Sequence, residues 1–213
     1  MELNNRIKAL IFDLDGVLVD TAHFHYLAWK EICSKYGMDL SLNDNLRLKG
    51  VSRTESLNII LNINNKSISQ GEKQQILVEK NQCYLKLIET LNSNDLLPGA
   101  LELLKSGKEH GLKIGLGSAS KNATAILERT KIVEYFDYVV DGNMVKNSKP
   151  APEVFELCAN KLAIEPEYCL VFEDSIAGVQ AAKTANMSSV GVGFPADIVV
   201  ADKHVDTLLN IKI

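Results

Sequence analysis

Two acidic pairs stand at the ends of apolar runs and have the residue types for metal-assisted chemistry. Asp13 and Asp15 follow ALIF, and Glu173 and Asp174 follow CLVF. Alternate side chains of a strand share a face, so Asp13 and Asp15 emerge together, about 6 to 7 Å apart. Like charges at a hydrophobic sheet edge resist ionisation unless a cation or strong donors compensate them. Both pairs together predict an oxygen-rich site for a hard cation such as Mg2+.

Hydroxyl and cationic residues suited to an anion lie between the two acidic pairs. The segment KIGLGSAS places Ser118 and Ser120 where a helix is expected to start with Lys121 and Asn122. Lys149, in NSKPAPEVF, precedes another expected helix. A helix cap and a solvated surface lysine are the ordinary roles of such residues. Acids for a metal combined with donors for an anion indicate phosphate chemistry.

Other kinds of site have less support. GLGSAS begins like a dinucleotide-binding loop, but the third glycine of that fingerprint would fall at Ser120, so a nucleotide cofactor is not favoured. No C-x-x-C pair is present, and apolar surroundings favour reduced core thiols at the four cysteines: Cys33, Cys83, Cys158 and Cys169.

Composition indicates an ordinary globular chain. It has 213 residues, of which 46% are hydrophobic and 23% charged. The net charge of -4 gives no footprint for nucleic acid. The N-terminal segment MELNNRIK leads into an apolar run that Asp13 and Asp15 interrupt, which resembles neither a signal peptide nor a spanning helix. We therefore expect a cytoplasmic monomer that acts on a small molecule, with no nucleic-acid or membrane partner.

Short apolar runs alternate with helical patterns. The runs KALIFD, KIGLGS, YVVD, CLVFED and SVGVG read as buried strands, and helices are expected over 99–110, 121–130, 151–163 and 175–186. Pro152 suits a first helical turn, and Gly111 suits a C-terminal cap. The pattern predicts the α/β class, with a parallel sheet and crossover helices.

Residues 20–92 form the exception, because they contain only helical patterns. AHFHYLAWKEICSKYG and EKQQILVEKNQCYLKLIETL have apolar residues at helical spacing, and Ser52 with Glu55 fits a capping box. We expect a helical cap domain over 20–92, inserted into a catalytic core formed by 1–19 and 93–213. Such an insertion after the first strand would lie over the strand ends, where open α/β sheets bind ligands.

These motifs in combination resemble the four-motif signature of the haloacid dehalogenase superfamily of phosphotransferases. The matching residues are DLDGVLVDT, Ser118, Lys149 in SKPAP, and FEDS. The resemblance implies a Rossmann-like core with a helical cap, Mg2+ dependence and an aspartyl-phosphate intermediate. It makes Asp13 the nucleophile and Asp15 the acid/base. It also implies phosphoryl contacts from Ser118 and Lys149, and a metal site made by Asp13, Asp15, Glu173 and Asp174.

The segments TAHFHYLAW, LKGVSR, SASKN and SKPAP further resemble the sugar-phosphate mutases of that superfamily. The resemblance implies conversion of β-D-glucose 1-phosphate to glucose 6-phosphate, with β-D-glucose 1,6-bisphosphate as the activating intermediate. Contacts to the non-transferring phosphate are implied for Arg53, Ser120, Lys121 and Asn122. The remaining implied substrate-binding residues are Thr21, His25, Trp29, Lys49, Gly50, Val51, Ser52, Lys80 and Ala119.

Two other functions are compatible with parts of this pattern. A Mg2+-dependent phosphatase acting on a sugar phosphate or phosphoglycolate would keep every core residue and differ only in the cap. A binding module without catalysis would leave the complete acidic set unexplained. The cap residues also have ordinary structural roles as alternatives to substrate binding. Lys49 and Arg53 would be solvated surface charges, Trp29 a core side chain, and His25 a hydrogen-bonded supporting residue.

Overall fold

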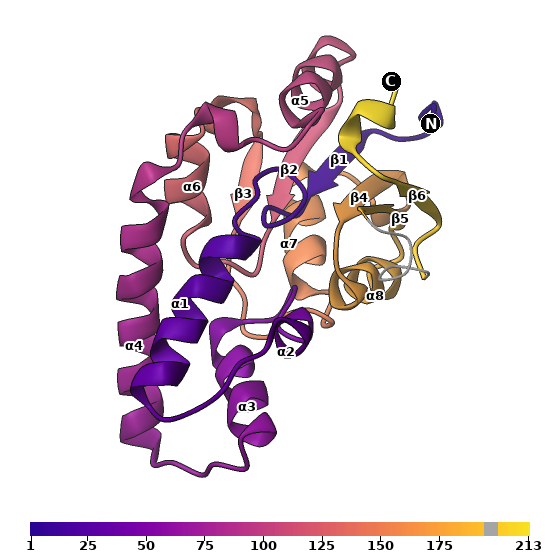
Figure 1. Ribbon diagram of the computed structural model, residues 1–213. Helices are drawn as coiled ribbons and strands as arrows, with labels where there is room; N and C mark the ends of the chain where they lie inside the picture. The colour runs from indigo at the N-terminus through magenta and orange to yellow at the C-terminus, as the bar shows by residue number, and fades with distance from the viewer. Residues whose placement is uncertain (194–199) are drawn as a thin grey trace. The chain divides into compact units, whose positions relative to one another are not determined.

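The computed structural model describes residues 1–193 and 200–213, which divide into two compact units (Figure 1). The core unit comprises Met1–Asp20 and Leu91–Ile213, and the helical unit comprises Thr21–Thr90. Among the described residues, no helix is both long and apolar enough to cross a membrane. The α/β class is confirmed in the core unit.

The described part of the core unit builds a six-stranded parallel sheet in the order β3-β2-β1-β4-β5-β6 (Figure 1). The strands are β1 (Ala9–Phe12), β2 (Lys113–Gly117), β3 (Tyr138–Val140), β4 (Cys169–Glu173), β5 (Ser188–Val192) and β6 (Lys203–Val205). The first five correspond to the predicted apolar runs. The edge strand β6 was not predicted, because its sequence KHV has no apolar run to mark it.

In the described residues, four α-helices of the core unit lie between these strands: α5 (Ala100–Glu109), α6 (Ala123–Arg129), α7 (Glu153–Leu162) and α8 (Ile176–Thr184). Each lies inside a predicted helical range, with ends moved by a few residues. Gly111 follows α5 with a φ of 71°, which glycine adopts readily, and Leu112 then donates to the Gly107 carbonyl at 2.9 Å. Pro152 is the residue that caps α7.

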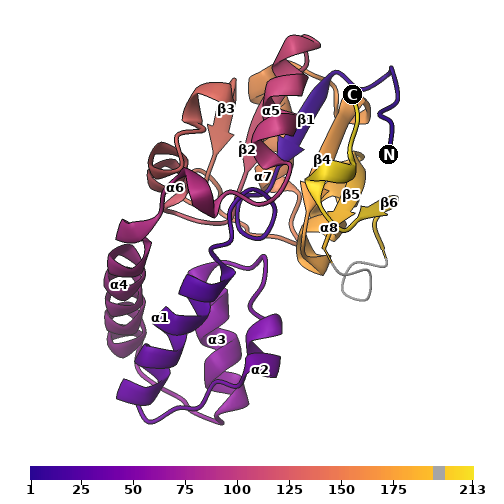
Figure 2. The same cartoon turned by 45° about the horizontal axis from the view of Figure 1, so that its top comes forward.

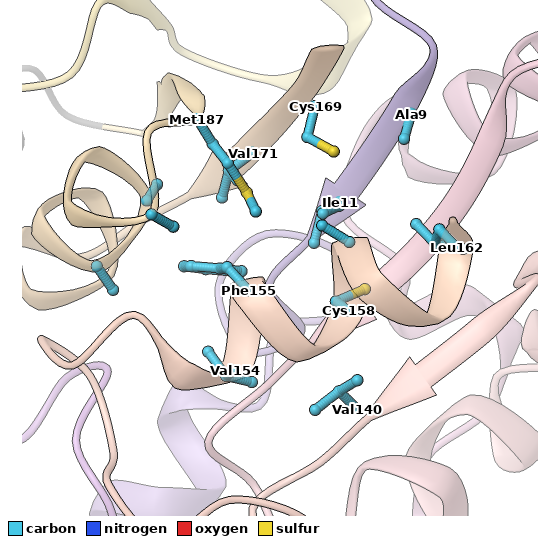
Figure 3. Close-up of a cluster of buried hydrophobic side chains, with 14 residues drawn as sticks. Ala9, Ile11, Val140, Val154, Phe155, Cys158, Leu162, Cys169, Val171 and Met187 are labelled. Atoms are coloured by element: carbon cyan, nitrogen blue, oxygen red, sulfur yellow. The ribbon is translucent and has the colours of Figure 1, made fainter. Parts of the chain in front are cut away.

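Alternate residues of the central strands pack on opposite faces of the sheet. Ile11 and Val171 face a cluster that contains Phe155 of α7 and Met187, the residue just before β5 (Figure 3). Leu10 lies on the other face, where its Cδ1 would be 3.3 Å from a Cβ built on Gly107 of α5. Figure 2 shows α5 beside β1 and β2. The pleat therefore turns the residue after β1, number 13, towards the face that α7 and α8 cover.

The helical unit consists of α1 (Ala22–Lys35), α2 (Leu42–Leu46), α3 (Arg53–Ile63) and α4 (Gln70–Leu87), followed by a short 3-10 turn (Ile88–Thr90). Its own buried cluster includes Trp29, Ile60 and Ile76. Complete capping boxes start α2 at Ser41 and α4 at Ser69. The short helix α2 was not predicted.

The capping box predicted for α3 is only half formed. Ser52 Oγ accepts a hydrogen bond from the Glu55 N–H at 3.2 Å, as expected of a cap. The Glu55 carboxylate accepts from the Asn58 amide at 3.3 Å instead of completing the box. The prediction was therefore correct for the start of the helix and wrong for the reciprocal bond.

The expectation of four core thiols is also only partly correct. Cys33, Cys158 and Cys169 are free and buried. Cys83 is half-buried, and its Sγ donates to the Glu31 carboxylate at 3.2 Å. Burial raises the pKa of Cys33 to about 11 and, with Glu31, that of Cys83 to about 11. Thiols with such pKa values stay protonated near neutral pH and are poor nucleophiles.

Candidate functional site

The candidate site begins where β1 and β4 end side by side. These strands pair in parallel with Phe12 opposite Phe172, and the Asp13 N–H donates to the Phe172 carbonyl at 2.9 Å. The two phenylalanine rings stack on one face with centroids 4.8 Å apart. Asp13 and Glu173 come next in register, so their side chains turn to the opposite face. The strand order reverses between β1 and β4, which is where open α/β sheets form their ligand crevice.

Lys149 joins these two acids. Its Nζ lies 2.5 Å from Asp13 Oδ1 and 2.5 Å from Glu173 Oε1, and it sits over the Phe155 ring, 4.7 Å from the centroid. All three charged side chains are buried. One cation therefore holds two carboxylates from neighbouring strands in a fixed geometry. Charge-assisted hydrogen bonds of this kind are strong where water is excluded.

The acids also form a cluster with the geometry of a cation site. Carboxylate oxygens of Asp13, Glu173 and Asp174 all lie within 4.8 Å of one another. Gly16 makes room for this cluster, because a Cβ built on it would lie 2.2 Å from Asp174 Oδ2. Its φ of 82° is a second reason for glycine at this turn. An all-oxygen donor set of this kind fits a hard divalent cation.

The charges of the cluster are not balanced by Lys149 alone. Burial raises the pKa of Asp13 well above its usual range, and Glu173, Asp15 and Asp174 raise it further against the opposing effect of Lys149. Burial by itself would lower the pKa of Lys149, but Asp13 and Glu173 outweigh it, so that pKa is raised. A further positive charge beside Asp13 would favour its ionised form.

Ser118 follows β2, the other neighbour of β1, and so belongs to the same sheet edge. It is buried, and its Oγ accepts from the Ser120 N–H at 3.1 Å. Ser120 Oγ accepts in turn from the Asn122 N–H at 3.3 Å. The helix itself starts at Ala123, two residues later than predicted, and leaves Lys121 exposed in the turn. These bonds give the Ser118–Asn122 turn a defined conformation.

The loop after β3 also supports this turn. The Gly142 N–H donates to the Ser120 carbonyl at 3.2 Å, and the Asn143 side-chain amide donates to the Lys121 carbonyl at 3.0 Å. The loop is in turn held by Asp141, which accepts from Asn143. The predicted anion-binding turn is therefore braced from β3, a feature that the sequence alone did not indicate.

A second group of predicted residues lies inside the helical unit. Lys80 of α4 is buried, with Nζ 2.8 Å from His25 Nδ1, 5.3 Å from the Trp29 ring centroid and 4.6 Å from that of Tyr84. Trp29 is almost fully buried in the hydrophobic cluster of this unit, so it also has a packing role. Thr21 is buried and precedes α1, and its carbonyl accepts from the His25 N–H at 3.1 Å.

The segment before α3 carries the remaining predicted residues of the helical unit. Lys49, Gly50, Val51 and Ser52 are half-buried, and Gly50 has a φ of 72°. Arg53 is the first residue of α3, and burial lowers its pKa. The contacts of these residues to a substrate stay predictions.

The protonation of His25 is expected to make stability depend on pH. Burial, then Lys80 and Arg53, hold its pKa well below the usual value of 6.5. The unfolded chain therefore binds a proton below about pH 6.5 that the folded chain does not, so stability falls as pH drops. We expect the melting temperature to fall more steeply from about pH 7 to 5 in the wild type than in His25→Gln. His23→Gln, an exposed change on the same helix, should keep the wild-type slope.

The fold agrees with comparisons with known proteins. The family model of the haloacid dehalogenase-like hydrolases matches residues 10–192, and the chain belongs to this family. It is 42% identical over 198 residues to β-phosphoglucomutase of Bacillus subtilis (strain 168), covering 92% of this chain and 88% of that protein. The crystal structure of β-phosphoglucomutase from Clostridium difficile superposes with a TM-score of 0.94 at 45% identity, covering 97% of this chain and 94% of that one.

A sugar phosphatase is also among the similar proteins. Fructose-1-phosphate phosphatase YqaB of Escherichia coli (strain K12) is 34% identical over 190 residues, covering 88% of this chain and 97% of that protein. The family thus includes both a mutase and a phosphatase that resemble this chain over most of their length. The chain is that of an enzyme.

Ser175, the last residue of the FEDS motif, has a role at the site that the motif alone did not indicate. Ser175 follows the Glu173–Asp174 pair, is buried, and donates its Oγ–H to Glu173 Oε2 at 2.8 Å. Its position directly after the acids and at the start of a predicted helix was a usable signal, because serine is a preferred helix cap.

Proposed function

We propose that this protein is a β-phosphoglucomutase, which converts β-D-glucose 1-phosphate and glucose 6-phosphate into one another. The observation that carries the proposal is the buried Asp13–Lys149–Glu173 array, in which one acid at the sheet edge is held beside a cation. The similarity to two β-phosphoglucomutases over about nine-tenths of the chain supports the choice of reaction.

In the first half-reaction the Asp13 carboxylate attacks phosphorus, forming an aspartyl phosphate as the bond from phosphorus to the sugar oxygen breaks. Asp15 gives its proton to that leaving oxygen. In the second half-reaction another sugar hydroxyl attacks the phosphorus, and Asp15 takes up its proton. β-D-glucose 1,6-bisphosphate is the phosphoryl donor of the first half-reaction, which releases glucose 6-phosphate, and it forms again in the second, when the 6-hydroxyl of β-D-glucose 1-phosphate takes the phosphoryl group from Asp13. Ser118 and Lys149 donate to the phosphoryl oxygens, and fixed donors of this kind stabilise the transition state without reorganising.

The proposed cofactor is Mg2+, held by carboxylates of Asp13 and Asp174 and the backbone carbonyl of Asp15, with Glu173 close by. The support is the all-oxygen donor set and the raised pKa of Asp13, which favours a further cation. When bound, Mg2+ would neutralise charge on the phosphoryl group and on the acids. Lys149 holds Asp13 in place for attack through its 2.5 Å contact.

A mutase must bind the phosphate that is not being transferred, and exclude water from the aspartyl phosphate. We assign the binding of the non-transferring phosphate to Arg53, Ser120, Lys121 and Asn122. The planar guanidinium of an arginine and backbone N–H groups can donate hydrogen bonds to the phosphate oxygens. The helical unit is the proposed cap. Other proposed substrate contacts come from Thr21, His25, Trp29, Lys49, Gly50, Val51, Ser52, Lys80 and Ala119.

The alternative is a Mg2+-dependent phosphatase acting on a sugar phosphate or phosphoglycolate. Its support is the similarity to a fructose-1-phosphate phosphatase, which differs from a mutase in where the phosphoryl group goes. The deciding assay supplies β-D-glucose 1-phosphate, Mg2+ and a trace of β-D-glucose 1,6-bisphosphate. Glucose 6-phosphate, detected with a coupled dehydrogenase, is the expected product. Release of one free phosphate per sugar consumed would favour the phosphatase instead.

Arg53→Ala is expected to impair binding of the non-transferring phosphate without impairing phosphoryl transfer from a substrate that has only one phosphate. Loss of the distal phosphate clamp should lower mutase kcat/KM by about 10- to 100-fold, while hydrolysis of p-nitrophenyl phosphate, which has no second phosphate, changes less than about threefold. Both rates are measured on the same preparation. Arg47→Ala, an exposed arginine before the same segment, serves as the control and should leave both rates unchanged. Equal losses on both substrates would remove Arg53 from the phosphate role.

A further inference from the structure

The carboxylate of Glu173 is buried, and donors hold both of its oxygens. Oε2 accepts from the Ser175 N–H at 3.0 Å and from the Ser175 Oγ–H at 2.8 Å. Oε1 accepts from Lys149 Nζ at 2.5 Å. Because a carboxylate is planar, fixing Oε2 on Ser175 directs Oε1 towards Lys149. The same Nζ meets Asp13, so Ser175 is connected to Asp13 through two charged side chains.

Gly178, in the first turn of α8, adjoins this carboxylate. Its N–H donates to Ser175 Oγ at 3.0 Å, which leaves the Ser175 hydroxyl proton for Glu173. A Cβ built on Gly178 would lie 1.8 Å from Glu173 Oε1, 1.9 Å from Cδ and 2.4 Å from Oε2. Real Cβ atoms essentially never come this close to other heavy atoms. Any other residue at 178 would therefore displace the carboxylate.

The backbone gives no reason of its own for glycine at this position. Gly178 lies within α8 and is not among the residues with positive φ. Alanine is the better helix former, and glycine inside a helix normally lowers stability. The structural reason for glycine at 178 is then the room that it leaves for Glu173.

We propose that Gly178 and Ser175 are positioning residues for phosphoryl transfer, acting through Glu173 and Lys149 on Asp13. The inference rests on the proposed function, in which Asp13 is the nucleophile. Displacing the Glu173 carboxylate would remove one of the two anchors of Lys149 Nζ, and the lysine would then leave its place beside Asp13. Small displacements of this kind have large effects on reaction rates.

The test is Gly178→Ala in the full chain, assayed with Mg2+ and p-nitrophenyl phosphate. We expect kcat to fall about tenfold or more while KM changes less than about threefold, since Lys149 acts on the nucleophile and on the charge of the transition state. The matched control is Gly107→Ala, another buried glycine of a core-unit helix, whose Cβ would have as its nearest neighbours Ile114 Cδ1 at 3.2 Å, Leu10 Cδ1 at 3.3 Å and Ile114 Cγ1 at 3.7 Å. Its kcat should stay within about twofold of the wild type.

A second readout needs neither metal nor substrate. In the wild type the Ser175 N–H is buried and bonded to Glu173, so its hydrogen exchange, followed by NMR in EDTA, should be slow. Gly178→Ala should speed this exchange about tenfold or more, and Gly107→Ala should not. Unchanged exchange, a kcat within twofold of the wild type, or an equal loss of kcat in the control would each overturn the inference.

Ser175 variants keep the inference testable if Gly178→Ala fails to fold. Ser175→Ala should lower kcat about three- to tenfold, and Ser175→Thr, which retains the hydroxyl, should restore it. Equal kcat in the alanine and threonine variants would contradict the role of the hydroxyl. If the wild type itself shows no turnover that depends on Asp13, the proposed function fails. If it does and the variants match it, only the further inference fails.

Discussion

Replacement of Asp13 by asparagine is expected to abolish turnover of both β-D-glucose 1-phosphate and p-nitrophenyl phosphate, on the order of 10^4-fold or more. An amide is a poor nucleophile and cannot form the acyl phosphate on which both reactions depend. Intact-mass measurement after acid quenching should show a protein carrying one phosphoryl group in the wild type and none in the variant.

The same substitution should not destabilise the fold. Because the pKa of Asp13 is raised in the folded chain, stability falls as the pH rises from the unfolded pKa of this group, and the loss is complete above the folded pKa. In EDTA at neutral pH the melting temperature of Asp13→Asn should therefore equal or exceed that of the wild type. Asp206→Asn, at an exposed position after β6, is the control and should keep full activity. A phosphorylated Asp13→Asn protein would exclude Asp13 as the acceptor.

Lys149→Met should lower both stability and activity. Methionine retains much of the side-chain length but leaves buried Asp13 and Glu173 without their shared cation. Breaking a buried ion pair from one side typically costs about 3 to 5 kcal/mol. We expect a loss of about 3 kcal/mol in the free energy of unfolding by urea at neutral pH in EDTA, and a fall in kcat of about 10^2- to 10^3-fold.

The stability loss in Lys149→Met should depend on pH in a defined direction. Without the lysine, the buried Asp13 carboxyl, whose pKa burial raises in the folded state, is more costly to ionise, so the deficit should grow from about pH 5 to 8. Lys105→Met, at an exposed position of α5, should show no such trend. A deficit that is constant across this range would indicate lost packing and not lost charge.

Local sequence patterns were sufficient for much of the fold. Strands β1 and β4 are continuous apolar runs, because parallel strands that are buried on both faces show no alternation of polar and apolar residues. Acidic residues mark the end of each run. Since carboxyl ends of parallel strands share an edge, the meeting of Asp13 with Glu173 and Asp174 followed from that pattern, and the structure brings them together. The strand β6 has no such pattern and is held by pairing with β5.

Other features depend on tertiary geometry that spacing does not encode. Cys83 has apolar neighbours in sequence, yet its place on α4 leaves it half-buried beside Glu31. The steric reason for Gly178 requires knowing how α8 lies against Glu173. The bracing of the Ser118–Asn122 turn by Asn143 joins segments that only the β2–β3 pairing places together. The substrate-binding roles of residues in the helical unit rest only on the family resemblance, and they stay predictions.

The central strand has consequences for how the chain folds. Residues 9–12 of β1 pair with 113–116 on one side and with 169–172 on the other. Such distant partners make the contact order high, and the chain must close long loops before these contacts form. The helical unit, whose contacts are local, can form early. During synthesis the acids that β1 and β4 contribute can therefore meet only after β4 has emerged from the ribosome, so the candidate site is assembled late.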